Sequence, residues 1–186
     1  MRRKSRALFS LIVLAIVIIL IYAVVKRPTP PPEKEAIVVL LGPPDIYPDR
    51  RLTPGATNQD IDQQNVGSTI CNPEWSTKLI RPPEDYTHRL KREQIEQYGY
   101  ADQDLRDYEE DHLIPLELGG NPTDPKNLWP EPYRTSIPDG GAHFKDQVEN
   151  YLHKEVCAGN MPLEEAQKEI ATDWYRIYLT DVRKNF

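Results

Sequence analysis

The chain has 186 residues and a formal net charge of −6, from 23 Lys and Arg against 29 Asp and Glu. The first 27 residues hold six of the basic residues and no acidic one, so the remainder carries 17 basic against 29 acidic side chains, a formal charge near −12. Such an acidic body argues against a high-affinity nucleic-acid binder, because neutralisation of phosphates supplies most non-specific affinity. It does not exclude a cation site, since carboxylates that hold a divalent ion count as negative until the ion is present.

The N-terminus has the pattern of a membrane anchor (residues 1–27). Basic residues precede an apolar run from Leu8 to Val25, which is about the minimum length for one membrane-spanning helix. More basic residues lie before the run than after it, which predicts a cytoplasmic N-terminus and an exported C-terminal body. The alternative is a cleaved signal peptide and a secreted protein, but such peptides usually have a shorter apolar core that ends at a small-x-small site.

A proline-rich stretch comes next. Eight prolines lie between Pro28 and Pro54, and this density favours extended polyproline geometry over helix. We therefore expect a semi-rigid stalk over residues 28–68, which separates the anchor from a folded domain at residues 69–186.

The folded domain is expected to be α+β. Apolar spacing predicts a first helix that stops at Gly99, a helical segment near residues 142–158 and a last helix that opens at Pro162. Turn signals between the first two helices predict a pair of short strands at 108–116 and 127–129.

The chain contains two cysteines, Cys71 and Cys157. In an exported domain an isolated pair is most simply one disulfide, which would tie the start of the domain to a late helix. Two unrelated buried thiols are the alternative. A four-cysteine zinc site is excluded by the count.

The centre of the domain, from "DYEEDHLIPLELGG" to the start of the helix near residue 142, carries the candidate chemistry. Asp111 and His112 precede a Gly-Gly turn, Asn127 lies after the turn, and His143 lies on the next helix. Hydrolysis of a phosphodiester needs a base for the attacking water and positive charge near the developing oxyanion. A neutral histidine can be that base. Oxygen and imidazole ligands together suit Mg²⁺, Mn²⁺ or Zn²⁺.

The segment "DHLIPLELGGNPTDPKNLWPEP", followed by "AHFKD", resembles the HNH branch of the ββα-metal (His-Me finger) nucleases. The resemblance covers residues 105–150. "STICNPEW", "IRPPEDYT" and "VCAGN" are also similar to small exported bacterial HNH-like proteins, over residues 69–178. The family implies a ββα-metal core with flanking helices. This chain lacks the paired C-x-x-C zinc sites of many members, and an insert, "EPYRTSIPDGG", separates the strand pair from the last motif residue.

The resemblance also implies a role for each motif residue. His112 would be the general base, and Asp111 and His143 would bind one divalent metal ion, Mg²⁺ or Mn²⁺ with Zn²⁺ as the alternative. Asn127 would brace the loop that orients His112, and Lys145 would lie near the scissile phosphate.

The Gly119-Gly120 turn of the motif is expected to need positive φ angles. The motif residues also have plain structural explanations. His112 could be a half-buried histidine beside an acidic run, and Asp111 one more solvated acid of that run. Asn127 could be an ordinary turn residue.

These observations support two functions of different class. The first is an exported, membrane-anchored, metal-dependent endonuclease that cleaves nucleic acid, DNA in the first instance, which it would bind weakly. The second is an inactive HNH-derived binding or structural module. Hydrolysis of a small phosphodiester is a third function, for which an acidic surface is less of an obstacle.

Overall fold

The computed structural model describes residues 45–185. The predicted anchor, residues 1–27, and the first part of the predicted stalk, residues 28–44, lie outside the described residues. Within residues 45–185, no helix combines the length and the apolar character that crossing a membrane requires.

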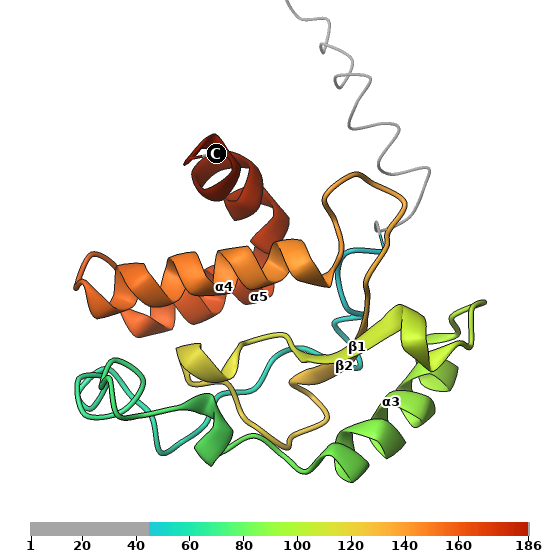
Figure 1. The fold of residues 1–186 in the computed structure, drawn as a ribbon, viewed down its shortest axis with the longest axis horizontal. Coiled ribbons are helices and arrows are strands. Elements are labelled where there is room, and N and C mark those ends of the chain that lie inside the picture. Colours follow the sequence, from blue (N-terminus) through green and yellow to red (C-terminus); the bar gives the residue numbers. More distant parts are fainter. Residues whose placement is uncertain (1–44, 186) are drawn as a thin grey trace, which may run out of the picture. The chain divides into compact units, whose positions relative to one another are not determined.

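The described part of the chain is a small α+β domain, as predicted (Figure 1). Its main elements, in chain order, are α3 (Glu84–Tyr98), β1 (Tyr108–His112), β2 (Leu128–Pro132), α4 (Ala142–Cys157) and α5 (Leu163–Ile177). Helices α4 and α5 lie side by side. The two strands lie between this helix pair and α3, which packs on the strands (Figure 1).

The predicted helices are confirmed and their ends have local causes. Helix α3 starts after Pro83 and ends at Gly99, whose φ of +68° gives the left-handed cap that glycine adopts most readily. Helix α5 starts after Pro162, which supplies no amide donor and so suits the start of a helix.

The strands differ from the prediction in length. β1 ends at His112 rather than at Leu116, because the apolar residues after it turn into the core and form a 3-10 turn at Leu116–Leu118. β2 extends further than predicted, to Pro132. The strands are antiparallel, with Asp111 opposite Trp129 and His112 opposite Leu128.

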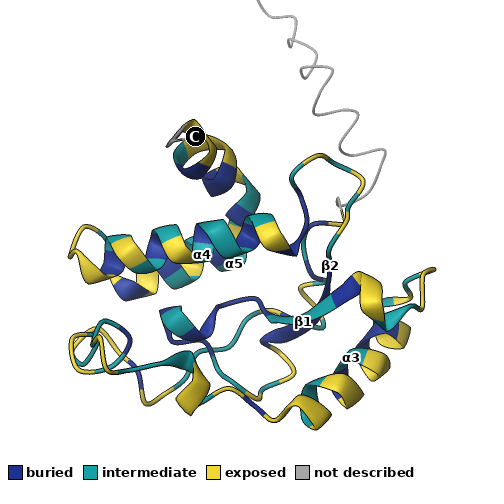
Figure 2. Cartoon of the chain, in the orientation of Figure 1, coloured by how far each residue is buried: buried dark blue, intermediate teal, exposed yellow. Residues whose placement is uncertain are grey.

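The apolar core lies mainly between α4, α5 and the loops that face them. Figure 2 shows buried residues along the inner sides of both helices and on the strands, whereas α3 exposes much of its outer side. The largest fully buried side chains include Trp129 on β2 and Trp174 on α5. The strand pair is thus covered on both faces and holds its polar residues in a low-dielectric setting.

The predicted stalk is wrong for residues 45–68, which belong to the folded domain. Ile46 and Ile61 are buried members of the core. Trp174 Nε1 donates to the carbonyl of Ile46 at 2.9 Å, and Thr53 Oγ1 donates to the carbonyl of Leu128 at 3.1 Å. The predicted domain start at residue 69 is therefore too late. The stretch before it is polar and rich in proline, but a few of its apolar side chains enter the core.

The predicted disulfide is confirmed. Cys71 and Cys157 are bonded with their Cα atoms 5.4 Å apart, so the alternative of two free thiols is wrong. The bond joins the loop before α3 to the end of α4, across a sequence separation of 86 residues.

Candidate active site

His112 stands at the end of β1 with its ring held by the loop that comes after the strand. Its Nε2 lies 3.0 Å from the carbonyl oxygen of Pro122. A carbonyl can only accept, so Nε2 carries the proton and Nδ1 of a neutral ring is the acceptor. Burial is the main cause that lowers the pKa of His112, against the opposing charge of Asp111. The ring is therefore neutral at pH 7, the state that a general base requires.

Asn127 makes four hydrogen bonds to the backbone around it. The residue is fully buried, and its Nδ2 donates to the carbonyls of Ile114 and Asn121, both at 3.0 Å. Its Oδ1 accepts from the amides of Ile114 at 3.0 Å and Ala56 at 3.3 Å. Asn121 directly precedes Pro122, so Asn127 fixes the carbonyl that in turn holds the His112 ring.

The two glycines of the Gly119-Gly120 turn are required for different reasons. Gly119 has a φ of +71°, as predicted. Gly120 does not have a positive φ, and that part of the prediction is wrong. What Gly120 requires is space, because a Cβ atom there would lie 1.7 Å from the carbonyl oxygen of Ile114.

Lys145 lies in the interior and not at a surface that a phosphate could reach. Its side chain has no exposed area, and its ammonium donates to Asp111 Oδ2 at 2.5 Å, to the His112 carbonyl at 2.9 Å and to Glu149. An ammonium has three donors, and these three acceptors use all of them. In this geometry Lys145 holds β1 and α4 together and has no donor left for a substrate.

The carboxyl groups around Lys145 differ in the direction in which their pKa values are shifted. Burial acts to raise the pKa of Asp111, but the charge of the Lys145 ammonium and its hydrogen bond to this carboxylate outweigh the effect of burial, so this pKa lies below its ordinary value. Burial raises the pKa of Glu131 well above its ordinary value, and the charge of Asp111 adds to the rise. Burial likewise raises the pKa of Glu149 to about 8, against the attraction of Lys145. Asp111 is thus the ionised partner of Lys145.

A small pocket of about 120 Å³ opens beside these residues. It is lined by residues from β1, α4 and the loops around them: Thr77, Arg81, Glu109, Asp111, His112, Pro115, Leu116, Glu117, Asp146 and Glu149. Five of these side chains are carboxylic acids, and burial raises the pKa of four of them, namely Glu109, Glu117, Asp146 and Glu149. The pocket therefore concentrates potential negative charge around one imidazole and one guanidinium.

His143 does not line this pocket. It lies in the first turn of α4 with a side chain that is 73% exposed, its ring centre 5.3 Å from that of Tyr133 and its Nδ1 3.8 Å from Asp146 Oδ2. The structure thus brings Asp111 and His112 to the pocket and leaves the second predicted metal ligand outside its lining. On α4, the acidic side chains that reach the pocket are Asp146 and Glu149, one and two turns into the helix.

Sequence reasoning missed several residues of the site. Glu109 and Glu110 look like solvated strand residues, yet both are partly buried. Glu131 gives no signal, because an acid between two prolines reads as exposed. The i, i+4 spacing of Lys145 and Glu149 could have indicated their ion pair. Nothing in the sequence places Arg81 beside His112.

Compared with protein-family models, with curated proteins and with solved structures, the chain shows no significant match.

Proposed function

We propose that this chain is a metal-dependent phosphodiester hydrolase that acts on nucleic acid, with His112 as the general base. The observation that carries the proposal is the neutral His112 ring, oriented by the Pro122 carbonyl, at the wall of an acidic pocket. A base needs both a defined orientation and a pKa low enough to be unprotonated at neutral pH, and His112 has both.

The residues around His112 divide the remaining tasks. Asn127 positions the base through Asn121 and Pro122. Arg81 is the basic side chain that lines the pocket, and it lies near enough to His112 to help lower that pKa. It is therefore better placed than the buried Lys145 to contact the phosphate of a substrate. Guanidinium groups suit this task because their planar donors match phosphate oxygens in pairs.

The pocket fits a divalent metal ion by its donors. Asp111, Asp146 and Glu149 offer carboxylate oxygens, which Mg²⁺ and Mn²⁺ prefer. Burial is the main cause that raises the pKa of Asp146 and of Glu149, and in both cases the charge of Asp111 adds to the rise. A dication beside these acids would favour their ionised forms. Such an ion would stabilise charge on the transferring phosphoryl group. His143 lies outside the lining of the pocket, but its Nδ1 is 3.8 Å from Asp146 Oδ2, and it remains the proposed imidazole ligand.

The substrate and the setting are inferred from the sequence. The acidic body predicts weak, salt-sensitive contact with nucleic acid, so that binding energy comes from the site and not from a basic surface. Residues 1–27 predict that the domain is exported and held at a membrane. DNA is the first substrate to test.

The test is nicking of supercoiled plasmid by the purified full-length chain with Mg²⁺ or Mn²⁺. We expect His112→Ala to lower the nicking rate by ~100-fold or more, within the range that general-base catalysis supplies. His88→Ala, an exposed histidine on α3, is the matched control and should keep the wild-type rate. Thermal melting of both variants separates a lost base from a lost fold. Wild-type protein that is inert with every divalent ion tried would contradict the proposal.

A second function, binding without turnover, is favoured by the position of Lys145. Its ammonium already lies among the carboxylates that would otherwise attract a metal ion, and all three of its donors are used. An internal cation of this kind could replace the metal in a module that only binds. Metal titration followed by melting distinguishes the two: a working site is stabilised by ~2.7 kcal/mol at a hundred times its Kd, whereas a site closed by Lys145 shows no shift.

A further inference from the structure

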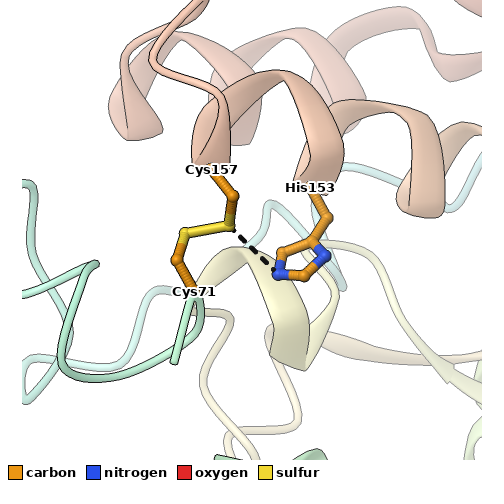
Figure 3. Close-up of side chains that lie close together, drawn as sticks. All are labelled: Cys71, His153 and Cys157. Atoms are coloured by element: carbon orange, nitrogen blue, oxygen red, sulfur yellow. Dashed lines mark hydrogen bonds between the residues drawn. A yellow bond between two sulfur atoms is a disulfide. The ribbon is translucent and has the colours of Figure 1, made fainter. Parts of the chain in front are cut away.

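Three side chains with atoms that bind zinc meet outside the lining of the acidic pocket. They are Cys71, His153 and Cys157, and one ligand atom of each lies within 4.8 Å of the other two (Figure 3). His153 Nε2 is 3.4 Å from Cys157 Sγ, and the two sulfur atoms are joined as the disulfide. The three residues differ in type from the oxygen ligands of the pocket, so a second and separate chemistry is present here.

Two of the three ligands are placed by helical geometry alone. His153 and Cys157 are four residues apart on α4, so their side chains lie on the same face of that helix. This arrangement does not depend on the disulfide. Reduction would leave the imidazole and the Cys157 sulfur as neighbours.

The third ligand is also held near the other two by contacts besides the disulfide. Ile70, next to Cys71, is 3% exposed and packs in the apolar core. Its carbonyl accepts a hydrogen bond from His153 Nε2 at 2.9 Å. The Cys71 amide donates to the carbonyl of Val66 at 2.9 Å, which closes the turn that presents the sulfur. We therefore expect Cys71 to stay beside α4 when the S–S bond is broken.

We propose that the reduced form of this cluster is a zinc site, with the thiolates of Cys71 and Cys157 and the imidazole of His153 as ligands. Two sulfurs and one nitrogen form a donor set that suits Zn²⁺, and a water molecule completes four-coordination. Two thiolates also balance the charge of the ion. That balance favours the bound state at a partly buried position, where an unpaired charge is costly.

Electrons and protons balance when the disulfide is converted to the zinc site. A dithiol reductant delivers two electrons and two protons, the S–S bond breaks to give two thiols, and the reductant becomes a disulfide. Zn²⁺ then displaces both thiol protons to solvent. The imidazole proton of His153 moves from Nε2 to Nδ1, so that the Nε2 lone pair faces the ion. The Ile70 carbonyl then loses its hydrogen bond from Nε2 and accepts one from water instead.

An entry path for the ion is present. A groove of about 720 Å³ runs along α4 beside the cluster and is lined by His153, Lys154, Cys157 and residues near them. Cys157 is exposed, and the other two ligands are partly exposed. Reductant and metal can therefore reach the sulfur atoms without unfolding of the domain.

The experiment uses Co²⁺ as the spectroscopic probe for zinc. The full-length chain is reduced with a phosphine, freed of reductant under argon and titrated with Co²⁺. We expect one equivalent to give thiolate-to-cobalt charge-transfer absorption that Zn²⁺ abolishes, and we expect no such band for the oxidised chain. Co²⁺ held by carboxylates gives no thiolate band, so the acidic pocket cannot produce the signal.

Variants decide whether the proposed ligands are used. Cys157→Ser should lose the charge-transfer band. His153→Ala should bind Zn²⁺ at least ~10-fold more weakly than wild type, because loss of a residue that merely supports a metal ligand already costs ~10-fold in affinity. His88→Ala should bind Zn²⁺ like wild type. A reduced chain without the band overturns the proposal, whether its helical circular dichroism is retained or lost. Equal Zn²⁺ affinity of His153→Ala and wild type also overturns it, since the site would then be two thiols alone.

Discussion

At Lys145 one ammonium faces three acids on three different elements, all of them buried or largely buried. It pairs with Asp111 on β1 and with Glu149 on its own helix, and Glu131 Oε2 on β2 lies 3.9 Å away. A buried charge cluster of this kind contributes less to stability than its many contacts suggest, because each ion loses its hydration. Removal of one partner is strongly destabilising, because the remaining charges are then buried without a counter-ion.

Lys145→Met therefore tests the cluster. Loss of the ammonium leaves Asp111 and Glu149 without a buried cation, and we expect the free energy of unfolding to fall by ~3–5 kcal/mol. Urea unfolding at pH 7 measures the change. Lys168→Met, an exposed position on α5, should stay within ~0.5 kcal/mol of wild type. Equal effects of the two substitutions would show that the cluster is not formed.

Glu110 makes stability depend on pH. Both of its carboxylate oxygens are buried and lack a hydrogen-bond partner, and burial raises the pKa of Glu110 to about 9. The folded state therefore favours the protonated acid. Its stabilising contribution is present below the pKa of the unfolded chain, near 4.5, and is lost as the pH rises toward 9.

Glu110→Gln removes this titration. We expect the variant to exceed wild type by at least ~1 kcal/mol in unfolding free energy at pH 8, since one pKa unit corresponds to about 1.4 kcal/mol, and the difference should shrink toward pH 5. Urea unfolding at both pH values measures it. Glu96→Gln, exposed on α3, should show no such pH-dependent gain. A gain for Glu110→Gln that is the same at pH 5 and pH 8 would contradict the assignment.

The long connection between β1 and β2 is held in place by hydrogen bonds along its length. Asn127 holds it from inside, and the segment near residues 55–58 runs along it: the Gly55 amide donates to the Lys126 carbonyl at 2.9 Å and the Asn58 amide to the Gly119 carbonyl at 2.8 Å. The orientation of His112 thus depends on a segment that precedes it by more than 50 residues in sequence.

Gly120→Ala should break this connection. The added methyl would overlap the Ile114 carbonyl and press on Asn127 Nδ2, at 1.7 and 2.9 Å. We expect a loss of ~2–3 kcal/mol or more, at the upper end of overpacking effects, as measured by thermal or urea unfolding. Gly67→Ala is the matched control, because its methyl would meet nothing within 4 Å. A tolerated Gly120→Ala would mean that the turn can shift without cost.

The elements that the sequence predicts are those whose signal is local. Helices α3, α4 and α5 each carry apolar side chains at helical spacing with a proline or glycine at an end. A spaced motif indicates the asparagine brace and the residues at the end of β1. The entry of Ile46 into the core, the burial of Glu131 and Lys145, and the approach of Arg81 to His112 arise from contacts between distant segments, which local pattern does not record.

For the whole molecule, the disulfide is the main covalent constraint in the described residues. It closes a loop across an 86-residue separation, and a bond of this kind stabilises chiefly by restricting the unfolded chain. The double variant Cys71→Ser/Cys157→Ser should lose ~2–4 kcal/mol of unfolding free energy relative to the oxidised wild type. Urea unfolding of the oxidised chain, the reduced chain and the double variant measures this. A double variant as stable as the oxidised chain would show that the bond does not constrain the unfolded state.

The same bond has a consequence for a chain that is cut. Both strands, the Asn127 brace and the pocket residues of α4 lie between Cys71 and Cys157. A protease that cleaves once between these cysteines, for example in the exposed stretch near Arg134 and Ser136, produces two polypeptides that remain covalently joined. Both halves of the pocket then stay tethered to each other, and the pieces separate only after reduction.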